Sequence, residues 1–132
     1  MLVEHPEAAL FDVHLPPSPW IDAMNWVKRQ PVGVHVFADP GHAWKYGTSV
    51  RVAAERDVLL EEVKDAALAI YSRDVAKRVV DRTNAIGDFT TLDAGRARDL
   101  ARQFDLDFLI AERDLDLPLA YRNSRFRIYS LK

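Results

Sequence analysis

Apolar residues in the first third of the chain repeat with the spacing of an amphipathic helix. Four of them lie at i, i+3, i+4 and i+7 and therefore share one helix face: Trp20, Ala23, Met24 and Val27. Ser18 supplies a hydroxyl for the N-cap, and Pro19 fits the first turn, where its missing N–H costs nothing. Pro31 disfavours helix at the residue before it. The pattern predicts a helix that begins at Ser18–Pro19 and ends before Pro31.

Two further segments have the same periodicity. A long one begins at Asp57, is interrupted around 72–74 and continues to about Arg82. Asn84 and Gly87 then indicate a turn. The next segment begins at Thr91, the expected N-cap, and directs apolar side chains inward as far as 104.

Shorter apolar runs bounded by turn residues predict strands at 34–38, 50–53 and 108–111. Residues 119–122 and 125–131 predict a closing hairpin whose turn lies at Asn123–Ser124. Because long helical segments separate 34–38 from 108–111, these two strands are expected to be parallel neighbours, with 50–53 beside them. The last strand is expected to be antiparallel at one side of the sheet.

This order of elements predicts an α/β fold, a three-layer sheet with mainly parallel central strands and an antiparallel C-terminal hairpin. With 132 residues, the chain has the length of one domain. Residues 1–17 contain three prolines and little periodicity, so they are expected to form an arm before a single domain at 18–132.

Composition argues against several functions. The absence of cysteine excludes disulfides, thiolate metal sites and a cysteine nucleophile. A net charge of −2 provides no basic field for nucleic acid, so we expect no nucleic-acid partner. None of the four histidines has the spacing of a zinc helix, and no glycine-rich phosphate loop is present, so no metal and no cofactor are expected.

The loop after the predicted first strand carries the best candidate for ligand binding. Ligands of open α/β sheets bind outside the carboxyl ends of the strands, where this loop is expected to lie. It combines a carboxylate, an imidazole, an ammonium group and two aromatic rings: Asp39, His42, Trp44, Lys45 and Tyr46. The alternative is structural: Asp39 caps a turn, the two aromatic rings cover the sheet edge, and His42 and Lys45 are solvated. No complete catalytic constellation is found.

Three stretches together show a resemblance to a known family. Residues 20–28 followed by 34–40 resemble "W-x-x-x-x-x-W-[VI]-[KR] … apolar strand … [DP]-P". Residues 104–110 resemble "Y-[GD]-[VI]-D-[YF]-[VL]-[VI]", and 119–131 resemble "[VL]-x-Y-x-N-x-x-[FY]-x-[VI]-Y-x-L". In combination they resemble the C-terminal domain of bacterial multi-pass membrane proteins related to GT-C glycosyltransferases, the dolichyl-phosphate-mannose mannosyltransferase-like group.

The resemblance implies an extracytoplasmic domain, excised or encoded as a fragment, on the periplasmic side of a bacterial cytoplasmic membrane. Its expected function is accessory or ligand recognition, without catalysis by this chain alone. The implied partners are the membrane-embedded part of the same or another protein and a sugar or lipid-linked sugar. No residue here matches the family's catalytic motif. The alternative is a free-standing small hydrolase or transferase that uses Asp39 and His42, and a cytoplasmic location remains the alternative to the periplasm.

Overall fold

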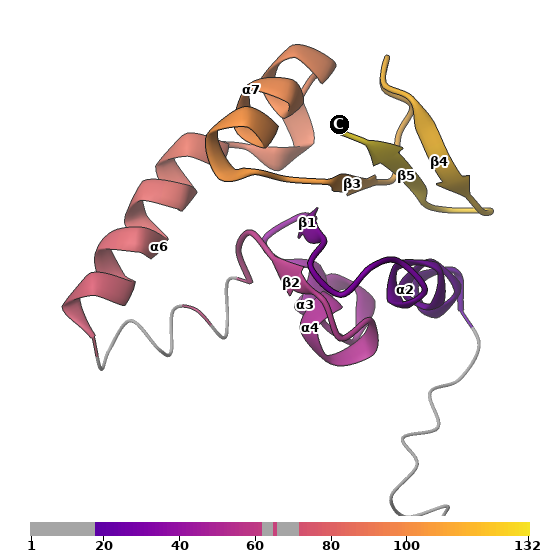
Figure 1. Cartoon of the computed structure of the whole chain (residues 1–132), viewed down its shortest axis with the longest axis horizontal. Helices are drawn as coiled ribbons and strands as arrows, with labels where there is room; N and C mark the ends of the chain where they lie inside the picture. Colours follow the sequence, from indigo (N-terminus) through magenta and orange to yellow (C-terminus); the bar gives the residue numbers. More distant parts are fainter. Residues whose placement is uncertain (1–17, 62–64, 66–71) are drawn as a thin grey trace, which may run out of the picture.

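The computed structural model describes residues 18–61, 65 and 72–132. The predicted arm at 1–17, and most of the predicted long segment between 62 and 71, lie outside the described residues. In chain order the elements are α2 (Pro19–Lys28), β1 (His35–Phe37), α3 (His42–Tyr46), α4 (Val50–Ala53), β2 (Asp57–Val58), α6 (Arg73–Ile86), the 3-10 turn η1 (Phe89–Thr91), α7 (Ala94–Phe104), β3 (Phe108–Ala111), β4 (Leu119–Arg122) and β5 (Arg127–Ser130) (Figure 1).

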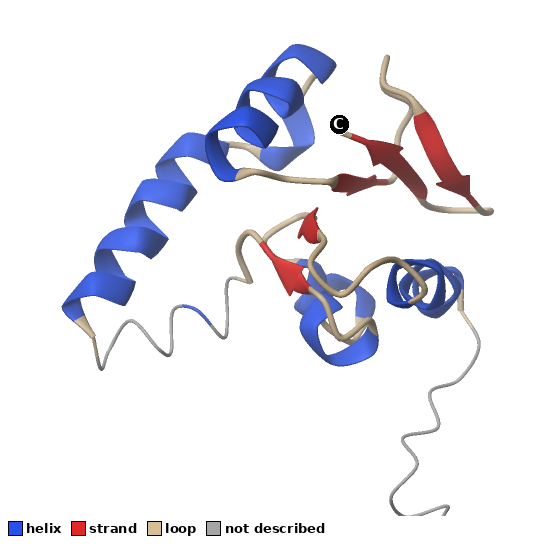
Figure 2. Ribbon diagram, viewed as in Figure 1, coloured by secondary structure: helices blue, strands red, loops and turns tan. Residues whose placement is uncertain are grey.

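Five strands form one mixed sheet in the order β2-β1-β3-β5-β4. β1 is parallel to both of its neighbours, whereas β5 is antiparallel to β3 and to β4. Helical segments separate β1 from β2 and β2 from β3 along the chain (Figure 2). The α/β expectation is confirmed, as are the parallel pairing of the first strand with 108–111 and the antiparallel pairing of the last strand.

The prediction of a strand at 50–53 is wrong, because Val50–Ala53 forms the short helix α4. The Ser49 hydroxyl accepts a hydrogen bond from Val52 N at 3.1 Å and so caps this helix. The second strand is β2, where the sequence predicts the beginning of a helix at Asp57. Leu59 N donates to Val36 O at 2.9 Å, so pairing with β1 overrides the helical spacing of this segment.

Serine or aspartate caps the N-termini of α2, α4, α6 and α7. Ser18 caps α2 as predicted, and Ser72, in the predicted interruption, caps α6. α6 continues to Ile86, beyond the predicted end at Arg82. The cap predicted at Thr91 is wrong: Asp93 caps α7 by accepting from the third amide of the helix, while Thr91 ends η1.

The side chains of β1 and of Ala38, which follows it, contribute to two apolar clusters. Val36 and Ala38 belong to a cluster with residues of α2 and α4, and Phe37 belongs to a cluster with residues of α6 and α7. This alternation is the two-residue period of a strand whose two faces are both buried. α6 and α7 lie together, separate from the group formed by α2, α3 and α4 (Figure 1). None of the helices described is long and apolar enough to cross a membrane.

Candidate functional site

The loop between β1 and α4 is closed by the imidazole of His42. Nδ1 lies 2.8 Å from Asp39 O, and Nε2 lies 3.1 Å from Val50 N. Because a backbone N–H only donates and a carbonyl only accepts, His42 is a neutral imidazole with its proton on Nδ1. The side chain is completely buried, and its ring centroid lies 5.7 Å from that of Trp20. His42 therefore joins the two ends of the loop.

Burial also decides the protonation of His42. Removal from water lowers the pKa of the imidazole below its ordinary value, although the hydrogen bond to Asp39 and the charges of Glu61 and Asp39 oppose this effect. Protonation would turn Nε2 into a donor facing the N–H of Val50. The geometry of the loop thus requires the neutral form.

Asp39 and Lys45 form an ion pair within the same loop. One oxygen of the Asp39 carboxylate accepts a hydrogen bond from Gly41 N at 2.9 Å, and the other contacts Lys45 Nζ. The Asp39 side chain is 14% exposed and that of Lys45 is 49% exposed, so the pair lies at the boundary with solvent. The backbone bond orients the carboxylate, and the carboxylate in turn orients the ammonium group.

Tyr46 points toward the protein and Trp44 points toward solvent. The Tyr46 hydroxyl donates to Glu112 Oε2 at 2.7 Å, and the Arg125 guanidinium lies 5.0 Å from the Tyr46 ring centroid. Burial raises the pKa of the Tyr46 phenol, and the hydrogen bond to Glu112 raises it further. Tyr46 also packs 4.7 Å from Trp20, between ring centroids. Trp44 is 79% exposed. Tyr46 therefore anchors α3, and Trp44 contributes an exposed ring.

A cavity of about 340 Å³ lies at the carboxyl end of β1. Its volume is within the range of small-molecule sites. Its floor is apolar, and five polar side chains line it. The lining residues are Asp39, Pro40, Lys45, Leu60, Thr83, Ile86, Gly87, Asp88, Phe89 and Thr90. The wall opposite the β1 loop is formed by the end of α6 and by η1, which are brought there by the crossover between β2 and β3.

The turn at 87–90 is held by the residues around it. Gly87 adopts φ 63° and ψ −134°, a conformation that is open essentially only to glycine. One oxygen of Asp88 accepts from Thr90 N at 3.0 Å and from Thr90 Oγ1 at 2.7 Å. The Phe89 ring packs edge-to-face on Phe37 of β1, with centroids 5.3 Å apart.

Two arginines bind the backbone beside this turn. Arg96 donates to the carbonyls of Ala85 and Ile86, and Arg113 donates to those of Phe89 and Leu92. These bonds fix the end of α6 and both sides of η1. The cavity wall therefore consists of ordered groups.

The structure brings together two of the five candidate residues at the cavity, Asp39 and Lys45. His42 and Tyr46 turn inward as structural anchors, and Trp44 does not line the cavity. Sequence reasoning missed Asp88 and Thr90, which contribute much of the polar lining. The "Asp-x-Thr" spacing after Gly87 indicates a local turn, but only the folded chain shows that this turn faces Asp39.

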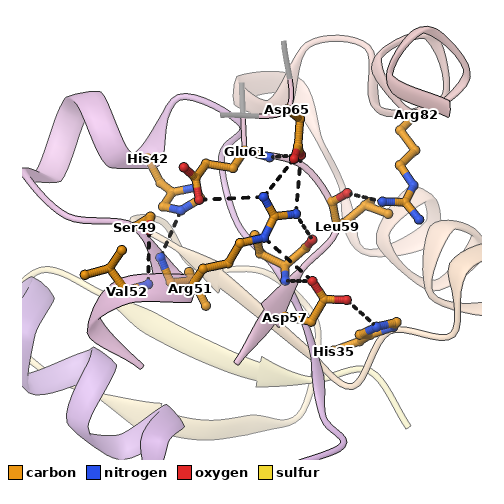
Figure 3. Close-up of polar contacts among 12 residues, drawn as sticks. His35, His42, Ser49, Arg51, Val52, Asp57, Leu59, Glu61, Asp65 and Arg82 are labelled. Carbon is orange, nitrogen blue, oxygen red and sulfur yellow. Dashed lines mark hydrogen bonds and ion pairs between the residues drawn. The ribbon is translucent and has the colours of Figure 1, made fainter. Parts of the chain in front are cut away.

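A separate polar cluster surrounds Arg51 (Figure 3). Its guanidinium contacts both oxygens of Asp65, at 2.7 and 3.4 Å, and lies 3.8 Å from Glu61 and 3.7 Å from Asp57. Burial opposes the charge of Arg51, but Asp65 and the other acids hold its pKa above the ordinary value. Glu61 Oε1 is buried without a hydrogen-bond partner. The cluster ties α4 to the end of β2.

A second cavity of about 370 Å³ adjoins this cluster. Arg51 and Arg82 line it, but Arg51 is engaged by Asp65, and Arg82 donates to Leu59 O at 2.8 Å. Asp65, another lining residue, is flanked by residues outside the described set. Within the described ranges, no three His, Asp or Glu side chains are placed to hold a metal ion. The cavity at β1 is therefore the better candidate.

No protein-family model, curated protein or solved structure matches the chain.

Proposed function

We propose that this chain is a ligand-recognition domain that is not catalytic by itself and that serves a membrane-bound glycosyltransferase-like protein. The observation that carries the proposal is the cavity at the carboxyl end of β1. Its lining joins an apolar floor to polar side chains from two distant segments, around 39–45 and 83–90. This combination is typical of small-molecule sites, in which apolar contact provides affinity and a few polar groups provide orientation.

The position of the cavity supports the proposal as well. β1 is parallel to both neighbours, and the carboxyl ends of parallel strands are where open α/β sheets bind ligands. The proposal includes the expected three-layer arrangement, which the two apolar clusters fed by alternate β1 residues support. The crossover from β2 to β3 then carries the 87–90 turn to the same end of the sheet.

The rival function, a free-standing hydrolase or transferase, has less support. It requires the His42 imidazole to exchange a proton with a substrate or with Asp39. The imidazole is fully buried, and both ring nitrogens are engaged by backbone groups. Its contact with Asp39 is with the carbonyl oxygen, whereas the Asp39 carboxylate binds Lys45. The geometry favours recognition over acid–base catalysis.

The proposed partner and location follow from the resemblance of residues 20–28, 34–40, 104–110 and 119–131 to the glycosyltransferase-related membrane proteins. We propose that the domain lies on the periplasmic side of a bacterial membrane and presents its cavity to a sugar or lipid-linked sugar handled by the membrane-embedded part. In this arrangement the domain binds or positions the ligand, and the chemistry takes place in its partner.

The test combines a thermal-shift panel with turnover assays on the purified chain. The panel contains simple sugars, nucleotide sugars and short-chain lipid-linked sugars, and the assays add generic ester and phosphate substrates. A ligand at ten times its Kd stabilises the fold by about 1.4 kcal/mol, which raises Tm by roughly 4–6 °C for a domain of this size. We expect such a rise for at least one compound, a smaller rise in Asp39→Asn, and no turnover.

Asp116→Asn is the matched control, because Asp116 is an exposed carboxylate that does not line the cavity. It should respond to the panel like the unmodified chain. A panel without any rise in Tm would contradict the recognition role. Turnover that disappears in Asp39→Asn or His42→Ala, in a variant that retains the fold, would instead establish the enzyme.

A further inference from the structure

The polar lining of the β1 cavity offers many hydrogen-bond acceptors and few donors. The Thr83 hydroxyl donates its proton to Val79 O at 2.7 Å, and the Thr90 hydroxyl donates to Asp88 at 2.7 Å. Each hydroxyl has one proton, so both threonines can offer a ligand only acceptor lone pairs. Carboxylates also only accept. Among the described residues of the lining, Lys45 is the side chain that can still donate a hydrogen bond to a ligand.

The charges of the lining also disfavour an anionic ligand. Asp39 and Asp88 supply two carboxylates and Lys45 supplies one ammonium group, so one negative charge is in excess. Hydrogen bonds from the Thr90 side chain and backbone lower the pKa of Asp88, which keeps it ionised at neutral pH. Lys45 is already paired with Asp39. An anionic ligand would meet an excess negative charge and a single, occupied cation.

We infer that the cavity is selective for an uncharged ligand rich in hydrogen-bond donors, that is, for neighbouring hydroxyl groups on a compact carbon skeleton. The inference rests on the proposed function and goes beyond it by excluding phosphate and diphosphate groups from this cavity. Hydroxyl protons of the ligand bind Asp39, Asp88 and the two threonine oxygens, and its carbon face lies on the apolar floor. Lys45 donates to one ligand oxygen.

Three probes separate the possible chemistries in an amide NMR titration of the full chain. myo-Inositol is neutral and donor-rich, inorganic phosphate is anionic, and 1,2-dimethoxyethane is neutral with oxygens but no hydroxyl protons. We expect saturable shifts at the amides of 39–45 and 87–90 with myo-inositol alone. Asp88→Asn keeps an oxygen for the Thr90 amide but loses the charge, and it should weaken binding about tenfold, the effect of one charge-assisted hydrogen bond.

The control variant Asp116→Asn should retain the affinity of the unmodified chain, since its carboxylate is exposed away from the cavity. Shifts of the same amides by phosphate or dimethoxyethane, without shifts by myo-inositol, would overturn the donor-rich inference and leave the cavity as a ligand site. If none of the three probes shifts these amides, both the inference and the recognition role of this cavity are contradicted. Equal binding to Asp88→Asn would also overturn the inference.

Discussion

Replacing His42 with glutamine is expected to destabilise the chain and to change how its stability depends on pH. The Gln amide oxygen can continue to accept from Val50 N, as Nε2 does at 3.1 Å, but the donor to Asp39 O at 2.8 Å is lost. The Asp39 carbonyl still accepts from the His42 backbone N–H at 2.8 Å, so the variant loses one hydrogen bond, about 1 kcal/mol, and the packing of the ring against Trp20, about another 1 kcal/mol. We therefore expect the free energy of unfolding at pH 7.5 to fall by about 2 kcal/mol.

The pH dependence follows from the lowered pKa of His42 in the folded chain. Below the unfolded pKa of about 6.5, the unfolded chain binds a proton that the folded chain resists, so stability is lost as the pH falls. Between pH 7.5 and 5.5 this linkage removes up to about 1.4 kcal/mol from the unmodified chain. Glutamine does not titrate, so the variant escapes this loss.

Urea denaturation of both proteins at pH 7.5, 6.5 and 5.5 measures the effect. The difference in unfolding free energy should be about 2 kcal/mol at pH 7.5 and should narrow steadily as the pH falls to 5.5. Contributions from the titratable groups that both proteins share cancel in the difference. A difference that stays constant across this range would refute the neutral, buried state of His42.

Three more substitutions test other parts of the structure. Arg51→Met leaves Asp65 and Glu61 without their cation and should lower the unfolding free energy by about 3 kcal/mol in urea; a loss under about 1 kcal/mol would contradict the importance of the cluster. Gly87→Ala places a side chain at φ 63° and should lower the unfolding free energy by about 1–3 kcal/mol in thermal melts. The control is Gly33→Ala, where the added Cβ meets open space, and it should change stability by less than about 0.5 kcal/mol. Asn123→Ala removes hydrogen bonds to Pro19 O, Arg125 N and Phe126 N and should lower the unfolding free energy by about 2 kcal/mol. Ser124→Ala should change it little, and equal losses in the two variants would argue against the anchoring role of Asn123.

Local sequence patterns were sufficient to predict a helix, strand or turn where one strong signal, such as a cap or an apolar run, identified it. Ser18–Pro19 predicted the beginning of α2, and the apolar run at 108–111 predicted β3 with its parallel neighbour. The hairpin turn at Asn123 was visible as well, from the turn residues between two short runs, although β5 buries the adjacent Ile128 and Tyr129 in two different apolar clusters. In each case propensity, cap chemistry and burial agreed.

The errors occurred where tertiary contacts decided between similar local signals. Val50–Ala53 is apolar and partly β-branched, as a strand would be, yet Ser49 caps it as a helix against α2. Asp57 begins a helical periodicity, but the β1 edge pairs with Val58 and draws it into the sheet. Short apolar runs do not separate these outcomes by periodicity.

The candidate site was predictable only in part. The end of a parallel strand indicated Asp39 and Lys45, and both line the cavity. The inward turn of His42 depends on a backbone N–H eight residues later, at Val50, which no local pattern indicates. The wall at Asp88 and Thr90 depends on the path of α6, so it required the fold itself.

A crystal structure of the chain soaked with myo-inositol would show whether the β1 cavity binds a donor-rich ligand. We expect density for the probe in the β1 cavity, with its hydroxyl groups within hydrogen-bond distance of the Asp39 and Asp88 carboxylates and its carbon face on Leu60 and Ile86. Soaking Asp88→Asn crystals under the same conditions should weaken that density. An empty cavity in both crystals, or probe bound elsewhere on the surface, would contradict the assignment of this cavity as the ligand site.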